Sequence, residues 1–111
     1  MYIDINGDSE LMIAADKGKI KIVKALLNTC TKEDIDYQNE YGNTALYLAA
    51  NHGHIEVVKL LLAANADPAL KNIADKDAAG AAFCQDFNNI VDLLPPIKEE
   101  DKLRYKPPVV E

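Results

Sequence analysis

The chain repeats its own sequence at a spacing of 33 to 35 residues, and this periodicity limits the folds open to it. Residues 41–67 repeat residues 6–30 at an offset of 35, which places Gly42 on Gly7. A weaker third copy follows at an offset of 33 and runs from about residue 72 to 94. A unit of this length is one supersecondary motif that buries its apolar face only by stacking on its neighbours. We therefore expect a linear array of stacked units within one folded body.

Each copy has the pattern of two short helices joined by a tight turn. In the second copy Thr44 can cap a helix with its hydroxyl, and residues 45–51 supply small and apolar side chains at helical spacing. Gly53 can adopt the left-handed conformation that ends a helix. The apolar stretch 57–62 then begins a second helix almost at once. The pattern predicts an all-α fold in which small residues on the first helix allow close approach between units.

The second copy also carries a family pattern. It reads Gly42-x-Thr44-Ala45-Leu46-Tyr47-x-Ala49-Ala50-x-x-Gly53-His54, then Val57-Val58-x-Leu60-Leu61-Leu62 and Asn65-Ala66-Asp67. The first copy retains Gly7, Ser9, Leu11, Ala14, Ala15 and Gly18. This pattern resembles the ankyrin repeat, closely in the second copy and loosely in the third. The resemblance implies an ankyrin-repeat solenoid of stacked helix-turn-helix units with β-hairpin-like connecting loops.

Several departures from the family pattern carry expectations of their own. The family's threonine-proline-leucine-histidine tetrapeptide reads Thr44-Ala45-Leu46-Tyr47, so its proline and its bridging histidine are absent. Asn65 stands where a glycine usually ends the second helix, and we expect it to adopt the left-handed conformation. The first copy holds two extra residues near 28–34, so we expect a protruding or bulged loop there. Asp86 and Phe87 replace the glycine-histidine pair of the third copy, which we interpret as a terminal cap.

The repeats define a body and a tail. We expect an ankyrin-repeat domain over residues 1–96, with repeats at about 4–36, 39–71 and 72–96, and a C-terminal tail over 97–111. The tail has four basic and four acidic residues, so the net charge of −6 belongs to the body. Three interpretations of the tail stay open. It is extended and serves as a recognition or export signal, or Leu103 and Tyr105 fold back on the last repeat, or it is disordered.

Patterns for catalysis and metal binding are missing from the sequence. It has no GxSxG, Walker, HExxH or EF-hand motif, and Cys30 and Cys84 have no metal-ligand spacing. His54 is expected to be a structural turn residue and His52 an exposed residue of the inner helix. The carboxylates of residues 33–36 are expected to lie in a solvated loop. We predict that the chain is not an enzyme and has no metal site, cofactor or small-molecule substrate.

Composition and charge exclude further classes of partner. A net charge of −6 disfavours binding to nucleic acid, because phosphate backbones repel an acidic surface. No apolar run of 18 residues is present, so we expect no membrane span. The first ten residues lack the basic and apolar regions of a secretory signal peptide, which predicts a cytoplasmic location. Export as an effector stays open.

The surface left for function is the concave groove that stacked units create. In the resembled family, contact residues lie at the hairpin tips and on the solvent side of the first helix. Carried over to this chain, the candidate partner-binding residues are Asp8, Asp16, Lys17, Gln38, Glu40, Tyr41, Asn43, Asn51, His52, Lys76 and Gln85. Tyr41 is the foremost candidate, since tyrosine is enriched in binding hot spots, unless its ring packs on a neighbouring hairpin. A basic patch of Lys19, Lys21 and Lys24 on the convex side is the second candidate surface.

These observations predict a protein-protein interaction module. Its first interpretation is an adaptor or inhibitor that docks a protein partner in the groove and is monomeric when alone. The alternative is a structural or assembly subunit that self-associates or caps a larger complex, with action as a bacterial effector on host proteins left open. The partner's identity is not encoded in a recognisable motif, because binding surfaces vary on a constant scaffold.

Overall fold

Three equivalent capping residues start the inner helices. Ser9, Thr44 and Asp77 each accept a hydrogen bond from the backbone N–H three residues later, which satisfies a donor that the first helical turn leaves free. The helices that follow these caps are α1 (Glu10–Asp16), α4 (Ala45–Asn51) and α6 (Ala78–Cys84). The computed structural model describes residues 2–107. Its caps confirm the helix start predicted at Thr44.

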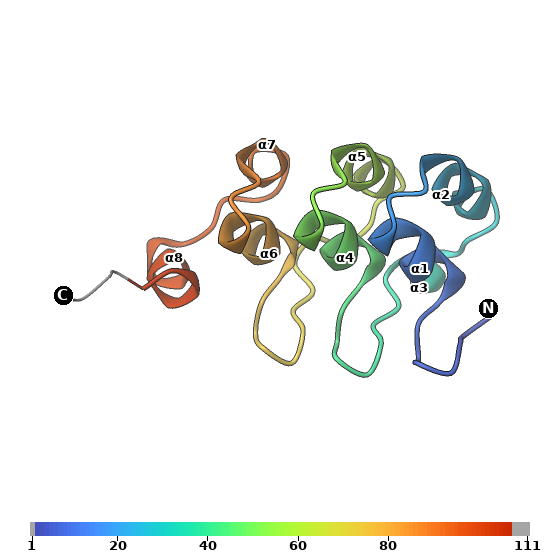
Figure 1. Cartoon of the computed structure of the whole chain (residues 1–111), viewed down its shortest axis with the longest axis horizontal. Coiled ribbons are helices and arrows are strands. Elements are labelled where there is room, and N and C mark those ends of the chain that lie inside the picture. Colours follow the sequence, from blue (N-terminus) through green and yellow to red (C-terminus); the bar gives the residue numbers. More distant parts are fainter. Residues whose placement is uncertain (1, 108–111) are drawn as a thin grey trace.

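The outer helices follow after tight turns. They are α2 (Ile20–Leu27), α5 (Ile55–Ala63) and α7 (Asn88–Val91). Gly18 and Gly53 occupy the turns with φ of 68° and 78°, and Asp86 takes the same left-handed conformation with φ of 64°. Figure 1 shows the result, with α1, α4 and α6 in one row, α2, α5 and α7 in a second, and long loops projecting on the opposite side of the inner row. The predicted all-α solenoid of stacked helix-turn-helix units is confirmed.

The core runs along the stack between the two rows of helices. Alanines bury completely where inner helices meet, as Ala15, Ala49 and Ala82 do. Val57 and Leu61 of α5 are also fully buried, and they fill the space between the rows. Small residues on the inner row and branched residues on the outer row therefore let neighbouring repeats approach closely.

The turns between inner and outer helices stack on one another. The His54 ring lies against Gly18, so that a Cβ there would be 2.6 Å from His54 Nδ1. His54 Nε2 also donates to the Asp16 carbonyl at 2.9 Å. Phe87 repeats this arrangement one unit later against Gly53. The structural role predicted for His54 is confirmed, and an aromatic ring replaces it at the next turn.

Two connecting segments test the expectations for the loops. Asn65 has φ of 65°, which confirms its predicted left-handed conformation. The segment expected to form a bulged, solvated loop instead contains α3 (Lys32–Ile35). A capping box starts this helix, because Thr31 and Asp34 each accept from the other's backbone N–H. Burial of Ile35 against the core holds it in place, so the solvated-loop interpretation was wrong for this segment.

The last helix closes the C-terminal end of the inner row. After Pro95 and Pro96 the chain forms α8 (Glu99–Tyr105), which packs on α6. The Tyr105 ring lies so close to Gly80 that a Cβ there would be 2.7 Å from its Cζ. Leu103, expected to fold back with Tyr105, is exposed. The described tail, residues 97–107, therefore contains a helix packed on the last repeat, and residues 108–111 lie outside the described part.

Candidate binding groove

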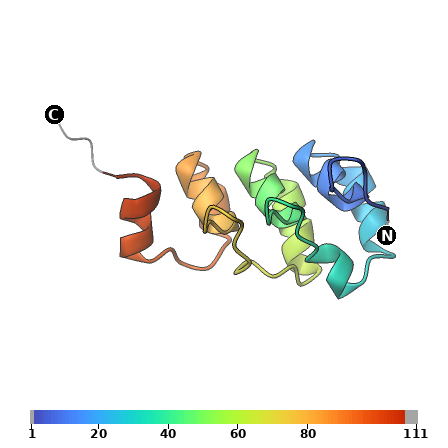
Figure 2. The ribbon, with the colours of Figure 1, turned by 90° about the horizontal axis from the view of Figure 1, so that it is seen from below.

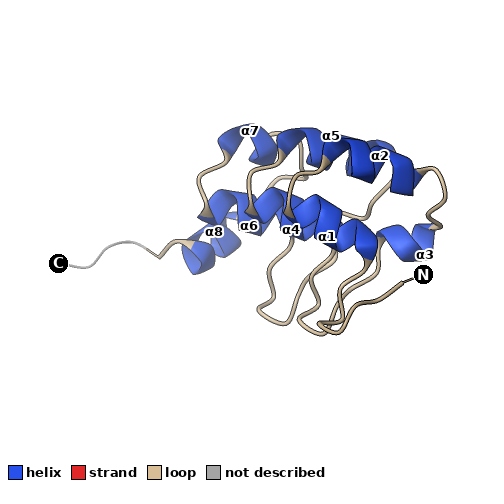
Figure 3. Cartoon of the chain, turned by 45° about the vertical axis from the view of Figure 1, so that its right-hand side comes forward, coloured by secondary structure: helices blue, strands red, loops and turns tan. Residues whose placement is uncertain are grey.

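The concave side of the stack carries an open groove between the long loops and the inner helices. Figure 3 shows these loops projecting from the row that contains α1 and α4. A cavity of about 590 Å³ lies between the first two loops and these helices. It is lined by Asp4, Asn6, Asp8, Met12, Ile13, Asp16, Lys17, Asn39, Glu40, Tyr41, Asn43 and Leu48.

The cavity gathers more than half of the candidate partner-binding residues. Those that line it are Asp8, Asp16, Lys17, Glu40, Tyr41 and Asn43. Those outside it are Gln38, Asn51, His52, Lys76 and Gln85. Lys76 contacts the tail helix instead of the groove, because its Nζ lies 5.8 Å from the centroid of the Tyr105 ring in α8.

Several candidate side chains hold the loops together. Asn39 Nδ2 donates to Asp8 Oδ1 at 2.8 Å, and Asn72 Nδ2 donates to Asn43 Oδ1 at 2.9 Å. Gln38 Nε2 donates to the carbonyls of Gly42 and Lys71 at 2.9 and 3.0 Å. Except for the bond from Gln38 to Gly42, which lies within the second loop, these bonds run from one loop to the next and fix the spacing of the loops. Asp8, Asn43 and Gln38 therefore have a scaffold role whether or not they contact a partner.

Other candidates pair across the inner helices. His52 Nε2 lies 2.8 Å from Asp16 Oδ1, and Gln85 Nε2 donates to Asn51 Oδ1 at 3.3 Å. Each pair joins the C-terminal ends of adjacent inner helices on the concave side. His52 is exposed, as the sequence predicts. Asp16 of the first pair also lines the cavity, whereas the second pair lies outside its lining.

The tips of the three long loops present large apolar side chains to solvent. Ile5 is 99% exposed, Tyr41 56% and Ile73 76%, and we call these three residues the tip row. The loops lie side by side, and the Ile73 N–H donates to the Tyr41 carbonyl at 2.9 Å (Figure 1). Tyr41 therefore shares a backbone bond with the next loop while most of its side chain stays accessible.

Sequence reasoning identified Tyr41 but missed its two neighbours. A signal was present, because the offsets of 35 and 33 place Ile5 and Ile73 on Glu40, a position in a turn between helices. Turns at the surface usually carry polar or small residues, so a repeated isoleucine there indicates an accessible apolar surface.

The groove is negatively charged. Its lining includes the carboxylates of Asp4, Asp8, Asp16 and Glu40, and Lys17 is the one lysine or arginine among the lining residues. Acidic groups that line a concave surface concentrate their field there and attract cations. The groove is thus suited to basic groups beside the apolar tip row.

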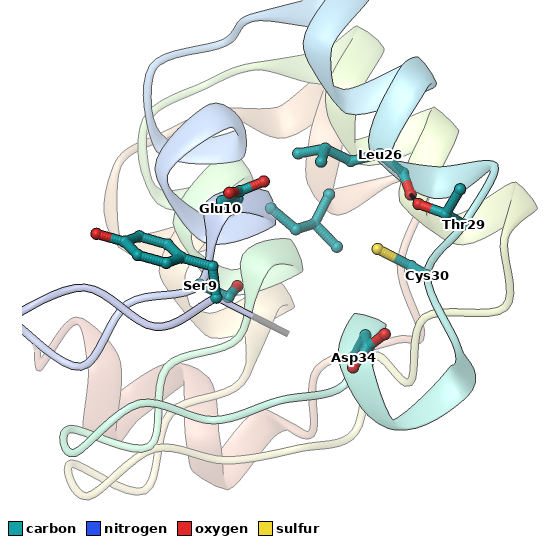
Figure 4. Close-up of a pocket in the computed structure, with 8 residues that line it drawn as sticks. Ser9, Glu10, Leu26, Thr29, Cys30 and Asp34 are labelled. Atoms are coloured by element: carbon teal, nitrogen blue, oxygen red, sulfur yellow. Dashed lines mark hydrogen bonds between the residues drawn. The ribbon is translucent and has the colours of Figure 1, made fainter.

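A smaller cavity lies at the N-terminal end of the stack. Its volume is about 240 Å³, and Figure 4 shows Cys30 and Asp34 among the residues that surround it. Burial raises the pKa of the Cys30 thiol, and the negative charges of Asp34 and Glu10 raise the pKa further. A thiol with a raised pKa is mostly protonated at neutral pH and is a poor nucleophile. The cavity therefore does not have the electrostatics of a cysteine-dependent active site.

This raised pKa gives a measurable prediction. In a Cys84→Ser variant, the rate at which Cys30 reacts with a maleimide should rise with pH along a curve whose midpoint lies above that of the same chain unfolded in urea. The reason is that folding buries the thiol beside two carboxylates, which disfavours the thiolate. A midpoint equal to or below that of the unfolded chain contradicts the prediction.

Metal sites and membrane spans are two further classes to consider. Among residues 2–107, no three His, Cys, Asp or Glu side chains group in a way that could hold a metal ion. Within that same range, every helix is too short or too polar to cross a lipid bilayer.

Comparison with known families adds one finding. A family model described as ankyrin repeats, in three copies, matches residues 2–72, which is more than half of the chain. No match is found among curated proteins. The matched region ends where the degenerate third copy begins, although α6 and α7 continue the same stacking beyond it.

Proposed function

The chain belongs to the ankyrin-repeat family, whose members are generally protein-protein interaction modules, and we propose on this premise that it is a non-catalytic adaptor or inhibitor that docks a protein partner in its concave groove. The proposed binding unit is the repeat body, residues 1–96, with residues 97–111 as a C-terminal segment. The proposed location is the cytoplasm, and export as an effector is the alternative.

The observation that carries this proposal is the pairing of the tip row with an acidic groove. Three large apolar side chains, each at least 56% exposed, lie at the tips of three neighbouring loops, and such a grouping forms an accessible apolar surface. Tyr41 of the tip row lines the cavity together with the carboxylates of Asp8 and Glu40. A partner segment that carries basic and apolar side chains fits this surface, since its charges would meet the carboxylates and its apolar groups the tip row.

The proposal predicts a partner that contacts Tyr41. A photoreactive benzoylphenylalanine in place of Tyr41 is expected to form a covalent adduct with one defined protein in the source cells. The same group in place of Ile20, an exposed apolar residue of α2 away from the groove, is the matched control and should not form this adduct. Equal adducts from both positions, or none from Tyr41, contradict groove binding.

Once the partner is captured, Tyr41→Ala should weaken its binding about 10- to 30-fold, as expected for an exposed aromatic anchor. Ile20→Ala should leave the dissociation constant unchanged. The affinity should also fall as salt is added, because the groove carboxylates attract basic groups on the partner. Isothermal titration calorimetry measures both effects, and an unchanged affinity for Tyr41→Ala would contradict the role of the tip row.

A second candidate function is a structural or assembly subunit. It is favoured by apolar side chains that remain accessible at the N-terminal end of the stack, where Ile22 is 51% exposed. This surface is separate from the tip row, so both roles are compatible in one chain.

A further inference from the structure

The first repeat keeps the stacking surface of an internal repeat although no repeat precedes it in the structure. At the offsets of 35 and 33, Leu26 corresponds to Leu61 and Leu94, which are buried against the preceding repeat. Ile22 corresponds in the same way to Val57 and to Ile90, both fully buried. In the first repeat, however, Ile22 is 51% exposed, and Leu26 is only partly buried.

These side chains lie together on one surface, which we call the end face. A shallow cavity of about 320 Å³ marks it. The end face consists of Glu10, Ile13, Ala14, Lys17, Lys19, Ile22 and Leu26. A terminal repeat that meets only water needs a polar outer face. The apolar centre of the end face therefore indicates that another surface covers it.

At the opposite end of the stack the inner row is covered by α8. Figure 2 shows α8 beyond the last repeat and the N-terminus at the other end of the row. Tyr105 covers Gly80, and ion pairs join Arg104 to Asp75 at 3.6 Å and Lys106 to Asp86. Because α8 packs on α6, it obstructs stacking of another copy on the inner row at this end. The outer row is not covered in the same way, since Leu93 is 40% exposed.

Of the three charged residues on the end face, Glu10, Lys17 and Lys19, the first two can pair with each other across a two-fold axis. Glu10 and Lys17 lie seven residues apart, which is two helical turns, so they share one side of α1. Ile13 and Ala14 lie midway between them. A two-fold axis through this midpoint sets two copies of α1 antiparallel and brings each Glu10 opposite the Lys17 of the second copy. The same operation places Ile22 near Leu26 of the second copy.

We propose that two copies of this chain associate through their end faces as a closed two-fold dimer. The dimer buries the apolar centre of each end face and pairs its acidic and basic ends. The tip rows stay outside the contact, whereas Ile13 and Lys17 line both the groove and the end face, so each groove adjoins the dimer contact. From the sequence, a monomer was the first interpretation and self-association the alternative. The exposure of Ile22, which is visible only in the folded stack, favours the alternative.

Sedimentation velocity of the full chain over a range of concentrations tests the dimer. The wild type should pass from monomer to twice the monomer mass. Ile22→Lys should raise the midpoint concentration about tenfold or more, because it places a charge in the apolar contact. Leu93→Lys, at an exposed apolar residue of the other end, is the matched control and should leave the midpoint unchanged. Circular dichroism checks that each variant folds.

Charge reversal tests the two-fold arrangement. Glu10→Lys alone should weaken the dimer, because it opposes Lys17 of the second copy, and the double variant Glu10→Lys/Lys17→Glu should restore it. A wild type that stays monomeric at every concentration overturns the dimer. A dimer that Ile22→Lys leaves intact overturns the end face as its site, and failure of the double variant to restore association overturns the antiparallel pairing. These results do not depend on capture of a partner at Tyr41.

Discussion

Replacing Leu61 by alanine is expected to lower the free energy of unfolding by about 3 to 4 kcal/mol. Leu61 is fully buried in the central repeat and belongs to the core that runs along the stack. Its truncation removes apolar contacts and leaves a cavity that close-packed neighbours can fill only in part. A domain of this size is typically stabilised by about 5 to 15 kcal/mol, so the loss is a large share. Urea unfolding followed by circular dichroism measures it.

Leu26→Ala is the matched control, because the chemical change and the place in the repeat are the same. Leu26 lies on the end face and is only partly buried, so its truncation should cost about 1 kcal/mol at a concentration where the chain is monomeric. Equal losses for both variants would contradict the claim that stacking of one repeat on the next buries this position.

The sequence predicts those parts of the fold that follow from one repeat and its neighbours. Thr44 is identifiable as a cap because it precedes a run of small and apolar residues, and Gly53 because a tight turn must follow that run. Asn65 is predicted to be left-handed for the same kind of local reason, and its φ confirms it. Such features depend on a few consecutive residues, which is why the sequence alone suffices for them.

The features that the sequence did not predict depend largely on contacts between distant residues. Residues 32–35 form a helix because Thr31 and Asp34 cap its start and Ile35 reaches the core. The cap is a local pattern that was missed, whereas the burial of Ile35 depends on distant residues. The tail helix α8 depends on Tyr105 fitting against Gly80, some 25 positions earlier in the chain. The prolines at positions 107 and 108 favoured an extended tail instead. For the tail, tertiary packing therefore outweighed the local signal.

The candidate site shows the same division between local and distant information. Family position placed Asp8 and Asn43 among the partner contacts, whereas the structure also engages both side chains in bonds between loops. Ile5 and Ile73 were missed because their shared exposed surface with Tyr41 becomes visible only once the three loop tips lie side by side. Substitutions that test binding should therefore favour Tyr41 and the isoleucines over the asparagines, whose loss would also disturb the scaffold.

The spacing of these loops depends on Gly42, and Gly42→Ala is expected to lower the free energy of unfolding by about 3 kcal/mol. Its φ is 76°, and an added Cβ would lie 2.8 Å from the backbone Cα of Asn72 in the next loop. The cost combines left-handed strain of about 1 to 2 kcal/mol with forced movement of that loop. Gly7→Ala isolates the strain, because Gly7 has φ of 81° with no atom within 4 Å of an added Cβ, and it should cost about 1 kcal/mol. Thermal and urea unfolding of both variants decides the point. Equal losses would mean that the second loop yields freely, and the contact between loops would then contribute little to the groove's shape.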